Sequence, residues 1–180
     1  MTPDSESKLK QFDEFFAIEY DFNVNIVSID SNQTISYQQF LNDMPMPFKM
    51  ASDIVSLDQA ALRPLQTLGS VAGQLVDYLH HQSQKIDLLV SYILNEQDEV
   101  SKRQQGISFG GGGITFFSTK IYQVNDIIEI KIFLNSENCA VYCYGEVIEI
   151  SSIDDKPSYK AIYHFTVSYT HLTLPTNREV

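Results

Sequence analysis

Four consecutive glycines, Gly110–Gly113, stand out in this chain of 180 residues. They follow a basic pair, Lys102 and Arg103, and then Ser108, in the stretch KRQQGISFGGGG. Backbone N–H groups in a glycine-rich segment can surround an anion, and nearby lysine or arginine can supply the positive charge. The same glycines can instead act only as backbone without a Cβ, at a bend or bulge where a sheet begins. Both interpretations fit these residues.

The glycine run matches neither of the common nucleotide-binding motifs. A Walker A loop needs G-x-x-x-x-G-K-[ST], and the dinucleotide fingerprint needs a helix after its glycines, whereas ITFF after Gly113 has the composition of a strand. The chain also contains 12 Lys and Arg against 23 Asp and Glu, a formal charge of -11. Such a chain repels DNA and RNA, so we predict no nucleic-acid partner, and an anionic ligand would need a local basic patch.

The residue types that most often carry catalysis are few and scattered. His80 and His81 fall on the polar side of a helical pattern, and His164 falls in a strand pattern, where a satisfied structural histidine is the commoner state. Cys139 and Cys143 are too far apart for a local bridge in extended chain, and two thiols alone make no zinc site. We therefore predict a protein that is not an enzyme and holds no metal or cofactor, in a reducing cytosol.

Residues 51–99 show helical periodicity. We expect one straight helix over residues 65–97, about 50 Å long at 1.5 Å per residue, which is longer than a small domain is wide. Part of it should project and associate with other copies as a coiled coil, giving a dimer or tetramer. The alternative is an amphipathic helix that lies on its own domain. The predicted oligomer interface consists of Leu65, Leu68, Leu75, Leu79, Ile86, Leu89 and Ile93.

Three local signals bear on how this helical region begins and continues. MPMPF at residues 44–48 is typical of a proline-broken connector. Ser56 with Gln59 resembles a capping box at the start of a helix. Gly69 and Gly73 each cost about 1 kcal/mol inside a helix, so they mark either a break or a close approach of two helices.

In DFNVNIVSID, Phe22, Val24 and Ile26 lie on one face and Asn23 and Asn25 on the other, which is the pattern of a half-buried strand. NEQDEVSKRQQ, residues 95–105, is typical of a polar hinge, and the chain after it is typical of β-structure. Ile128, Ile130 and Ile132 alternate with charged residues, and three further runs alternate in the same way, separated by turn residues. Closely spaced strands of this kind predict an antiparallel meander that curls into a small barrel. The predicted fold is α+β, with a strand-containing segment (1–50), a helical region (51–99), a β-barrel (100–167) and a tail (168–180).

Two stretches resemble the PilZ domain family, whose members are small β-barrels that bind the bacterial second messenger cyclic di-GMP. SFGGGGITF is similar to the family's D/N-x-S-x-x-G element, and VYCYGEVIEI is similar to one of its barrel strands. HHQSQKIDLLVSYILNEQDE resembles the helix through which an atypical PilZ branch assembles four chains. The resemblance implies a cytoplasmic bacterial signalling protein with protein partners.

The sequence departs from the family at the positions that hold the ligand. Binding members carry an R-x-x-x-R pair, which is absent here. Either Gly106 or Ser108 stands at the acidic position of D/N-x-S-x-x-G, depending on which glycine is aligned, and neither alignment supplies an Asp or Asn. We therefore expect an adaptor whose cyclic di-GMP binding is degenerate or absent and which acts by protein contact and self-association. The alternatives are a plain oligomerisation module and a cyclic di-GMP receptor with a non-standard site. That site would consist of Lys102, Arg103, Ser108, Gly110, Gly111, Gly112 and Gly113.

The two ends of the sequence carry separate expectations. No signal peptide is visible in MTPDSESKLK, and no run approaches the length of about 18 apolar residues that a membrane span requires. The tail SYTHLTLPTNREV resembles a translated sequencing adapter, so residues from about 168 onward are predicted not to be native.

Overall fold

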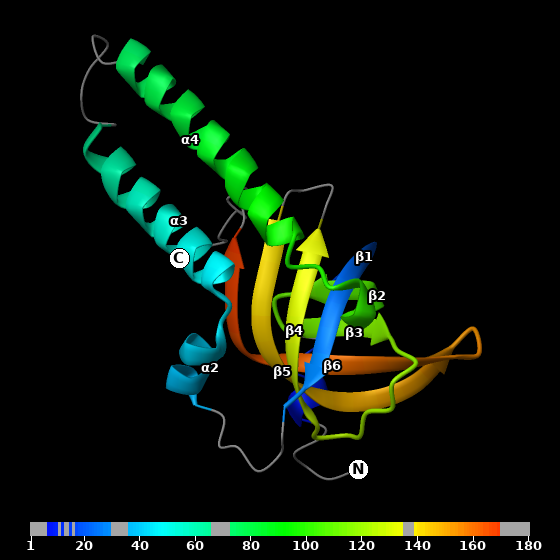
Figure 1. The fold of residues 1–180 in the computed structure, drawn as a ribbon. Helices are drawn as coiled ribbons and strands as arrows, with labels where there is room; N and C mark the ends of the chain where they lie inside the picture. The colour runs from blue at the N-terminus through cyan, green and yellow to red at the C-terminus, as the bar shows by residue number, and fades with distance from the viewer. Residues whose placement is uncertain are drawn as a thin grey trace.

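The centre of the protein is a closed barrel of six antiparallel strands (Figure 1). It is seen in a computed structural model that describes residues 7–10, 12, 15, 17–29, 36–65, 73–134 and 139–169. The order around the barrel is β1-β2-β3-β6-β5-β4. The strands are β1 (Ala17–Ser28), β2 (Arg103–Gly110), β3 (Gly113–Phe117), β4 (Ile127–Leu134), β5 (Cys139–Ile153) and β6 (Lys156–Tyr169). The predicted α+β class with a small antiparallel barrel is confirmed.

The sequence analysis missed two strands of the barrel. β1 lies outside the predicted barrel range of 100–167, and β2 lies inside it but was not recognised as a strand. β1 comes from the predicted N-terminal segment and closes the barrel by pairing with both β2 and β4, with Asn25 opposite Arg103 and Lys131. β2 was interpreted as a polar hinge, because its polar and glycine residues lack alternation. The topology is also not a simple meander, since β3 pairs with β6 rather than with β4.

The barrel interior is filled by the alternating apolar residues of its strands. Phe22, Val24 and Ile26 of β1 point inward as predicted, together with the isoleucines of β4. Asn25, predicted on the half-exposed face, is only 2% exposed. The segment between the helices and β2 covers that face. The remaining core residues are Ile114, Phe116, Tyr122, Ile128, Ile130, Ile132, Leu134, Cys143, Val147, Tyr159 and Ala161.

Helices cover one outer face of the barrel, and this explains why β5 is buried on both of its faces. α2 (Tyr37–Asp43) begins at Ser36, whose Oγ accepts a hydrogen bond from Gln39 N at 3.1 Å. Phe40 of α2 stacks on Tyr142 and meets Tyr144 edge-on. The second apolar cluster consists of Phe40, Met44, Phe48, Ala51, Val90, Leu94, Phe133, Ala140, Tyr142 and Tyr144.

The predicted single long helix is not confirmed. α3 (Met46–Leu65) and α4 (Gly73–Asn95) are separate helices that lie side by side and project from the barrel as an arm (Figure 1). Of the two alternatives for the glycines, a break is the observed one at Gly73, where α4 begins. Leu68 and Gly69 lie outside the described residues, as does the side chain of Leu65.

α3 begins earlier than the capping pattern predicted. It starts at Met46, and Pro47 lies in its first turn, where proline costs no hydrogen bond of the helix. Ser56 is therefore an interior residue, and its Oγ donates to the carbonyl of Ser52 at 3.0 Å instead of capping a helix. In the described part of the chain, no helix is both long enough and apolar enough to cross a membrane.

The predicted non-native tail is not supported by the strand that precedes it. β6 continues through residues 168 and 169, with Tyr169 opposite Ala140 of β5. Residues 170–180 lie outside the described part of the chain. The β5–β6 hairpin turns at Asp154 and Asp155, whose φ values of 50° and 61° fit the left-handed turn that a two-residue hairpin requires.

Candidate functional site

The glycine run forms the connection between β2 and β3, with a bend at Gly111 and Gly112. No described glycine has a positive φ, so the run is not explained by left-handed backbone. Close approach explains two of the positions instead. A Cβ on Gly113 would clash with the carbonyl oxygen of Ala161 and stand 2.6 Å from the ring of Phe12, and a Cβ on Gly111 would stand 3.0 Å from Phe15.

The rings of Phe12 and Phe15 come from the segment before β1. Phe12 is buried with Ile148 and Ile162, and Lys160 Nζ lies 5.3 Å from the centre of its ring. The glycine connection is therefore covered on one side by the protein's own aromatic residues.

A buried carboxylate also holds this N-terminal segment on the barrel. Glu146 Oε1 lies 2.7 Å from Lys8 Nζ, and its Oε2 lies 3.0 Å from His164 Nε2. His164 is thus a histidine with a structural partner, as its strand position predicted.

The structure does not bring the two halves of the predicted ligand site together. Lys102 and Arg103 lie at the start of β2, whereas Gly110 ends that strand and Gly113 begins the next. The seven steps of β2 separate them by about 23 Å at 3.3 Å per residue. Ser108 lies towards the glycine end. Whether these residues bind a ligand stays a prediction.

Both cations of the basic pair are already paired with carboxylates. Lys102 Nζ lies 2.8 Å from Glu99 Oε2, and this contact holds the pKa of Glu99 below its usual range. Arg103 contacts both carboxylate oxygens of Asp98, with Nε to Oδ1 at 3.1 Å and Nη2 to Oδ2 at 3.0 Å. Arg103 therefore has a fixed orientation rather than a free guanidinium.

Asp98 is the centre of a hydrogen-bond network that the sequence analysis missed. Asn25 Nδ2 donates to Asp98 Oδ1 at 2.8 Å, and Asn23 Nδ2 donates to Asp98 Oδ2 at 3.1 Å. The backbone N–H of Glu99 donates to Asn25 Oδ1 at 2.7 Å. The network fixes the segment between α4 and β2 onto β1. In the sequence, the network could be suspected only from Asn23 and Asn25, which alternate with the apolar residues of β1.

A groove of about 640 Å³ lies beside Arg103, at the end of the barrel away from the glycines. Arg103, Lys120 and Lys156 line it, and none of the described lining residues is acidic. The others are polar, apart from Phe117 and Pro157: Asn23, Ser101, Gln104, Gln105, Ser118 and Thr119. The sequence analysis identified only Arg103 here. Lys120, from the β3–β4 connection, and Lys156, from the start of β6, are both far from Arg103 in the sequence.

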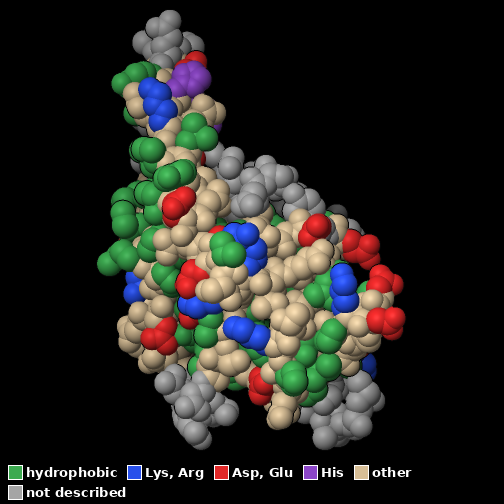
Figure 2. All heavy atoms as spheres, turned by 45° about the vertical axis from the view of Figure 1, so that its right-hand side comes forward, with side chains coloured by type: hydrophobic (Ala, Val, Ile, Leu, Met, Phe, Trp, Pro, Cys, Tyr) green, Lys and Arg blue, Asp and Glu red, His purple; other side chains and the backbone are tan. Residues whose placement is uncertain are grey.

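The projecting arm carries an exposed apolar surface, which we call the α4 stripe: Leu75, Leu79, Ile86, Leu89 and Ile93. These side chains are between 37% exposed, at Leu79, and 64% exposed, at Leu89. Figure 2 shows hydrophobic side chains gathered along one side of the arm. Val90 and Leu94 lie next to the stripe on the helix and are buried in the cluster against the barrel. The structure thus leaves the described part of the predicted interface accessible.

The remaining reactive residues have ordinary surroundings. Burial raises the pKa of the Cys143 thiol, whose Sγ lies 3.7 Å from the carbonyl oxygen of Ile130. His80 and His81 are exposed, and each contacts Gln84. Among the residues that the structure describes, no three His, Cys, Asp or Glu side chains come together as a metal site would require.

Comparison with known proteins gives a likeness to solved structures. No protein-family model and no curated protein matches the sequence. The chain is similar to a solved structure from Xanthomonas campestris, described as a pathogenic protein with a tetrameric PilZ domain self-assembled through a helical bundle. The TM-score is 0.48 at 12% identity, over 86% of this chain and 83% of the other. At these values the likeness assigns neither ligand nor function.

Proposed function

We propose that this protein is a PilZ-like signalling adaptor that acts by self-association and contact with other proteins. The observation that carries the proposal is the α4 stripe. Its five apolar side chains are exposed along a helix that projects from the barrel. Contiguous exposed apolar surface is typical of a protein–protein interface.

The apolar surface of α4 is wider than the part that the barrel covers. Val90 and Leu94 bury one margin of it against the barrel cluster. The exposed part, the α4 stripe, repeats at intervals of three, four and seven residues, as the seam of a helical bundle does. An amphipathic helix that only lies on its own domain needs no apolar surface beyond that contact, so the exposed part favours a partner helix.

The residues proposed to hold cyclic di-GMP support an adaptor rather than a receptor. Lys102 is paired with Glu99 and Arg103 with Asp98. The Asp98 side chain is largely buried, so separating it from Arg103 is costly. Phe12 lies against the glycine connection at the other end of β2. A cyclic dinucleotide would have to displace these contacts before it could reach both ends.

Sedimentation equilibrium tests the self-association. Ile86→Glu with Leu89→Glu places two charges in the α4 stripe, where they cannot be desolvated in a bundle, so the oligomer should dissociate to monomers of 20.5 kDa. Gln84→Glu is the matched control, because it adds charge to the same helix, about 200° round the axis from Ile86. A monomeric wild type, or dissociation by Gln84→Glu alone, would contradict the proposal.

The second candidate is a cyclic di-GMP receptor with a non-standard site. It is favoured by the position of Arg103 at the edge of a groove without acidic lining residues. Calorimetric titration with cyclic di-GMP decides between the two candidates. Micromolar binding that Lys102→Gln and Ser108→Ala both weaken would establish the receptor, whereas no heat would leave the adaptor.

A further inference from the structure

The groove at the start of β2 has the charge pattern of an anion site in a chain that is otherwise acidic. Its three basic residues, Arg103, Lys120 and Lys156, come from a strand, the β3–β4 connection and the β5–β6 hairpin. Two acidic side chains bond to residues that line the groove: Asp98 accepts from Arg103, and Asp21 accepts from Gln105 Nε2 at 3.2 Å. Three basic side chains in one groove are unexpected in a chain with a net charge of -11, and they indicate a local role for positive charge.

Arg103 is oriented in the groove by groups behind it. Asn23 and Asn25 donate to Asp98, and Asp98 accepts from Nε and Nη2 of Arg103. A guanidinium has five N–H donors, so two contacts leave donors for a ligand in the groove. A guanidinium fixed by a carboxylate from behind loses little freedom when it binds an anion in front.

The two lysines keep their charge available. Neither Lys120 nor Lys156 forms a salt bridge in the described part of the chain, and both are exposed. Lys156 Nζ lies 5.6 Å from the centre of the Phe117 ring, which places the ammonium group over the groove wall. Phe117 and Ser158 are paired across β3 and β6, so this wall belongs to the barrel itself.

The rest of the lining consists largely of hydroxyl and amide groups. Ser101, Thr119, Gln104 and Gln105 offer both donors and acceptors. Such groups suit the hydroxyls of a sugar better than an apolar molecule. The volume of about 640 Å³ is within the range of small-molecule sites.

We propose that this groove binds a small phosphorylated sugar, with its phosphate on Arg103, Lys120 and Lys156 and its hydroxyls on the polar lining. A free sugar phosphate and a mononucleotide share this chemistry. The site is independent of self-association, because its residues lie on the barrel and the α4 stripe lies on the arm.

Titration calorimetry on the full chain in about 50 mM NaCl tests this site. The probes are inorganic phosphate, ribose 5-phosphate and AMP. Ribose 5-phosphate or AMP should bind more tightly than inorganic phosphate. Comparison of those two then identifies the source, because a base that adds affinity points to a nucleotide. No binding of any probe at about 10 mM, or equal affinity for all three, would overturn the proposal.

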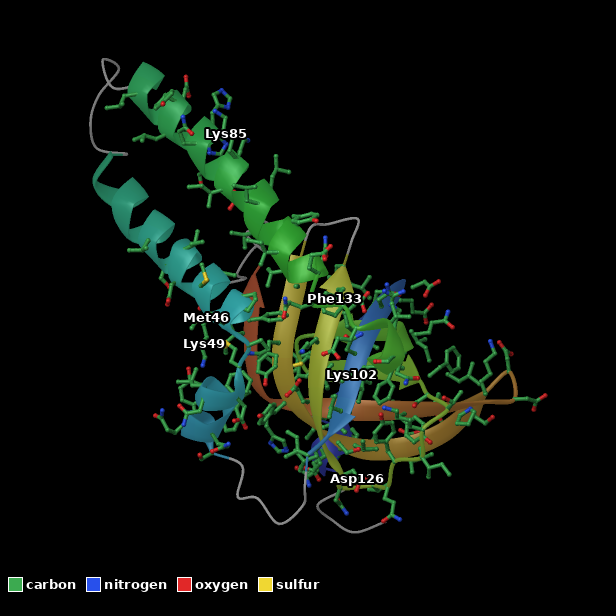
Figure 3. All side chains as sticks on the ribbon, viewed as in Figure 1. Met46, Lys49, Lys85, Lys102, Asp126 and Phe133 are labelled. Atoms are coloured by element: carbon green, nitrogen blue, oxygen red, sulfur yellow. The ribbon has the colours of Figure 1, made fainter. Side chains whose placement is uncertain are left out.

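Charge-removing variants locate the site. Lys120→Gln and Lys156→Gln should each weaken binding about tenfold, since each removes one charge-assisted contact from an exposed side chain. Lys49→Gln and Lys85→Gln remove the same charge from α3 and from α4, away from the groove (Figure 3), and should change affinity less than about twofold. Equal losses in all four variants would show a general charge effect and contradict the site. Loss of sugar-phosphate binding in the Ile86→Glu, Leu89→Glu variant would contradict its independence from self-association.

Discussion

The ring of Phe22 occupies the space where a side chain at residue 106 would stand. Phe22 and Gly106 are directly opposite each other on β1 and β2, and a Cβ built on Gly106 would clash with the ring. Phe22 is also edge-on to Phe109, with ring centres 5.2 Å apart. Gly106 therefore has a packing role in this barrel.

Gly106→Ala should destabilise the protein by about 1–3 kcal/mol, because a well-packed interior cannot accept an extra methyl group without displacing a ring. Urea unfolding followed by circular dichroism measures this change. Gly111→Ala is the matched control, since its nearest neighbour is Phe15, which is 49% exposed and free to shift. Equal effects of the two substitutions would show that Phe22 does not determine the requirement for glycine.

Asn25→Ala should cost about 2–3 kcal/mol, because it removes a donor from Asp98 and leaves the N–H of Glu99 without its acceptor. The free energy of unfolding in urea is again the measurement. Lys102→Ala breaks a neighbouring ion pair that is largely exposed, and such pairs contribute less than about 1 kcal/mol. If Asn25→Ala costs no more than this control, the network around Asp98 does not hold the linker.

Tyr144 should make stability depend on alkaline pH. Burial first, and then its hydrogen bond to Asp43, raise the pKa of Tyr144 to about 12. The neutral phenol is thus favoured in the folded state, so its contribution is complete below the ordinary value of about 10 and is lost as the pH rises towards 12.

Unfolding of wild type and Tyr144→Phe at pH 8 and pH 11 checks this dependence. Phenylalanine cannot ionise, so stability should fall less between the two pH values in the variant. Tyr163, whose raised pKa comes from burial and does not involve Tyr144, contributes equally to both proteins. The same loss in both proteins would exclude Tyr144 as a source.

The parts of the fold that were predicted correctly depend on local pattern. Alternation in β1, β4 and β5 gave the inward-facing residues because each strand has one face in the barrel interior. Pairing between distant segments could not be inferred in this way. β2 has polar residues and a glycine where alternation was sought, and only its partners β1 and β3 define it as a strand.

The site was predicted less well than the fold, for the same reason. The sequence analysis considered Lys102 and Arg103 as a basic pair without partners. In the structure Glu99 and Asp98 bind these two cations and fix their orientation. Lys120 and Lys156 were not identified from the sequence, because the groove is formed by a strand, a connection and a hairpin that are far apart in the chain. The helical seam was visible in sequence, but the reversal between α3 and α4 was not.

The place of β1 between β2 and β4 affects how this protein is made. The ribosome completes β1 first, and then the whole arm, before either neighbouring strand exists. Until β2 emerges, β1 has two unpaired edges, and the edge that pairs with β4 stays unpaired until β4 follows. The apolar face of β1 is also uncovered in this period, which is a hazard for association with other nascent chains. A shortened gene that encodes only residues 100–167 would lack β1, so β2 and β4 would each keep one unpaired edge permanently.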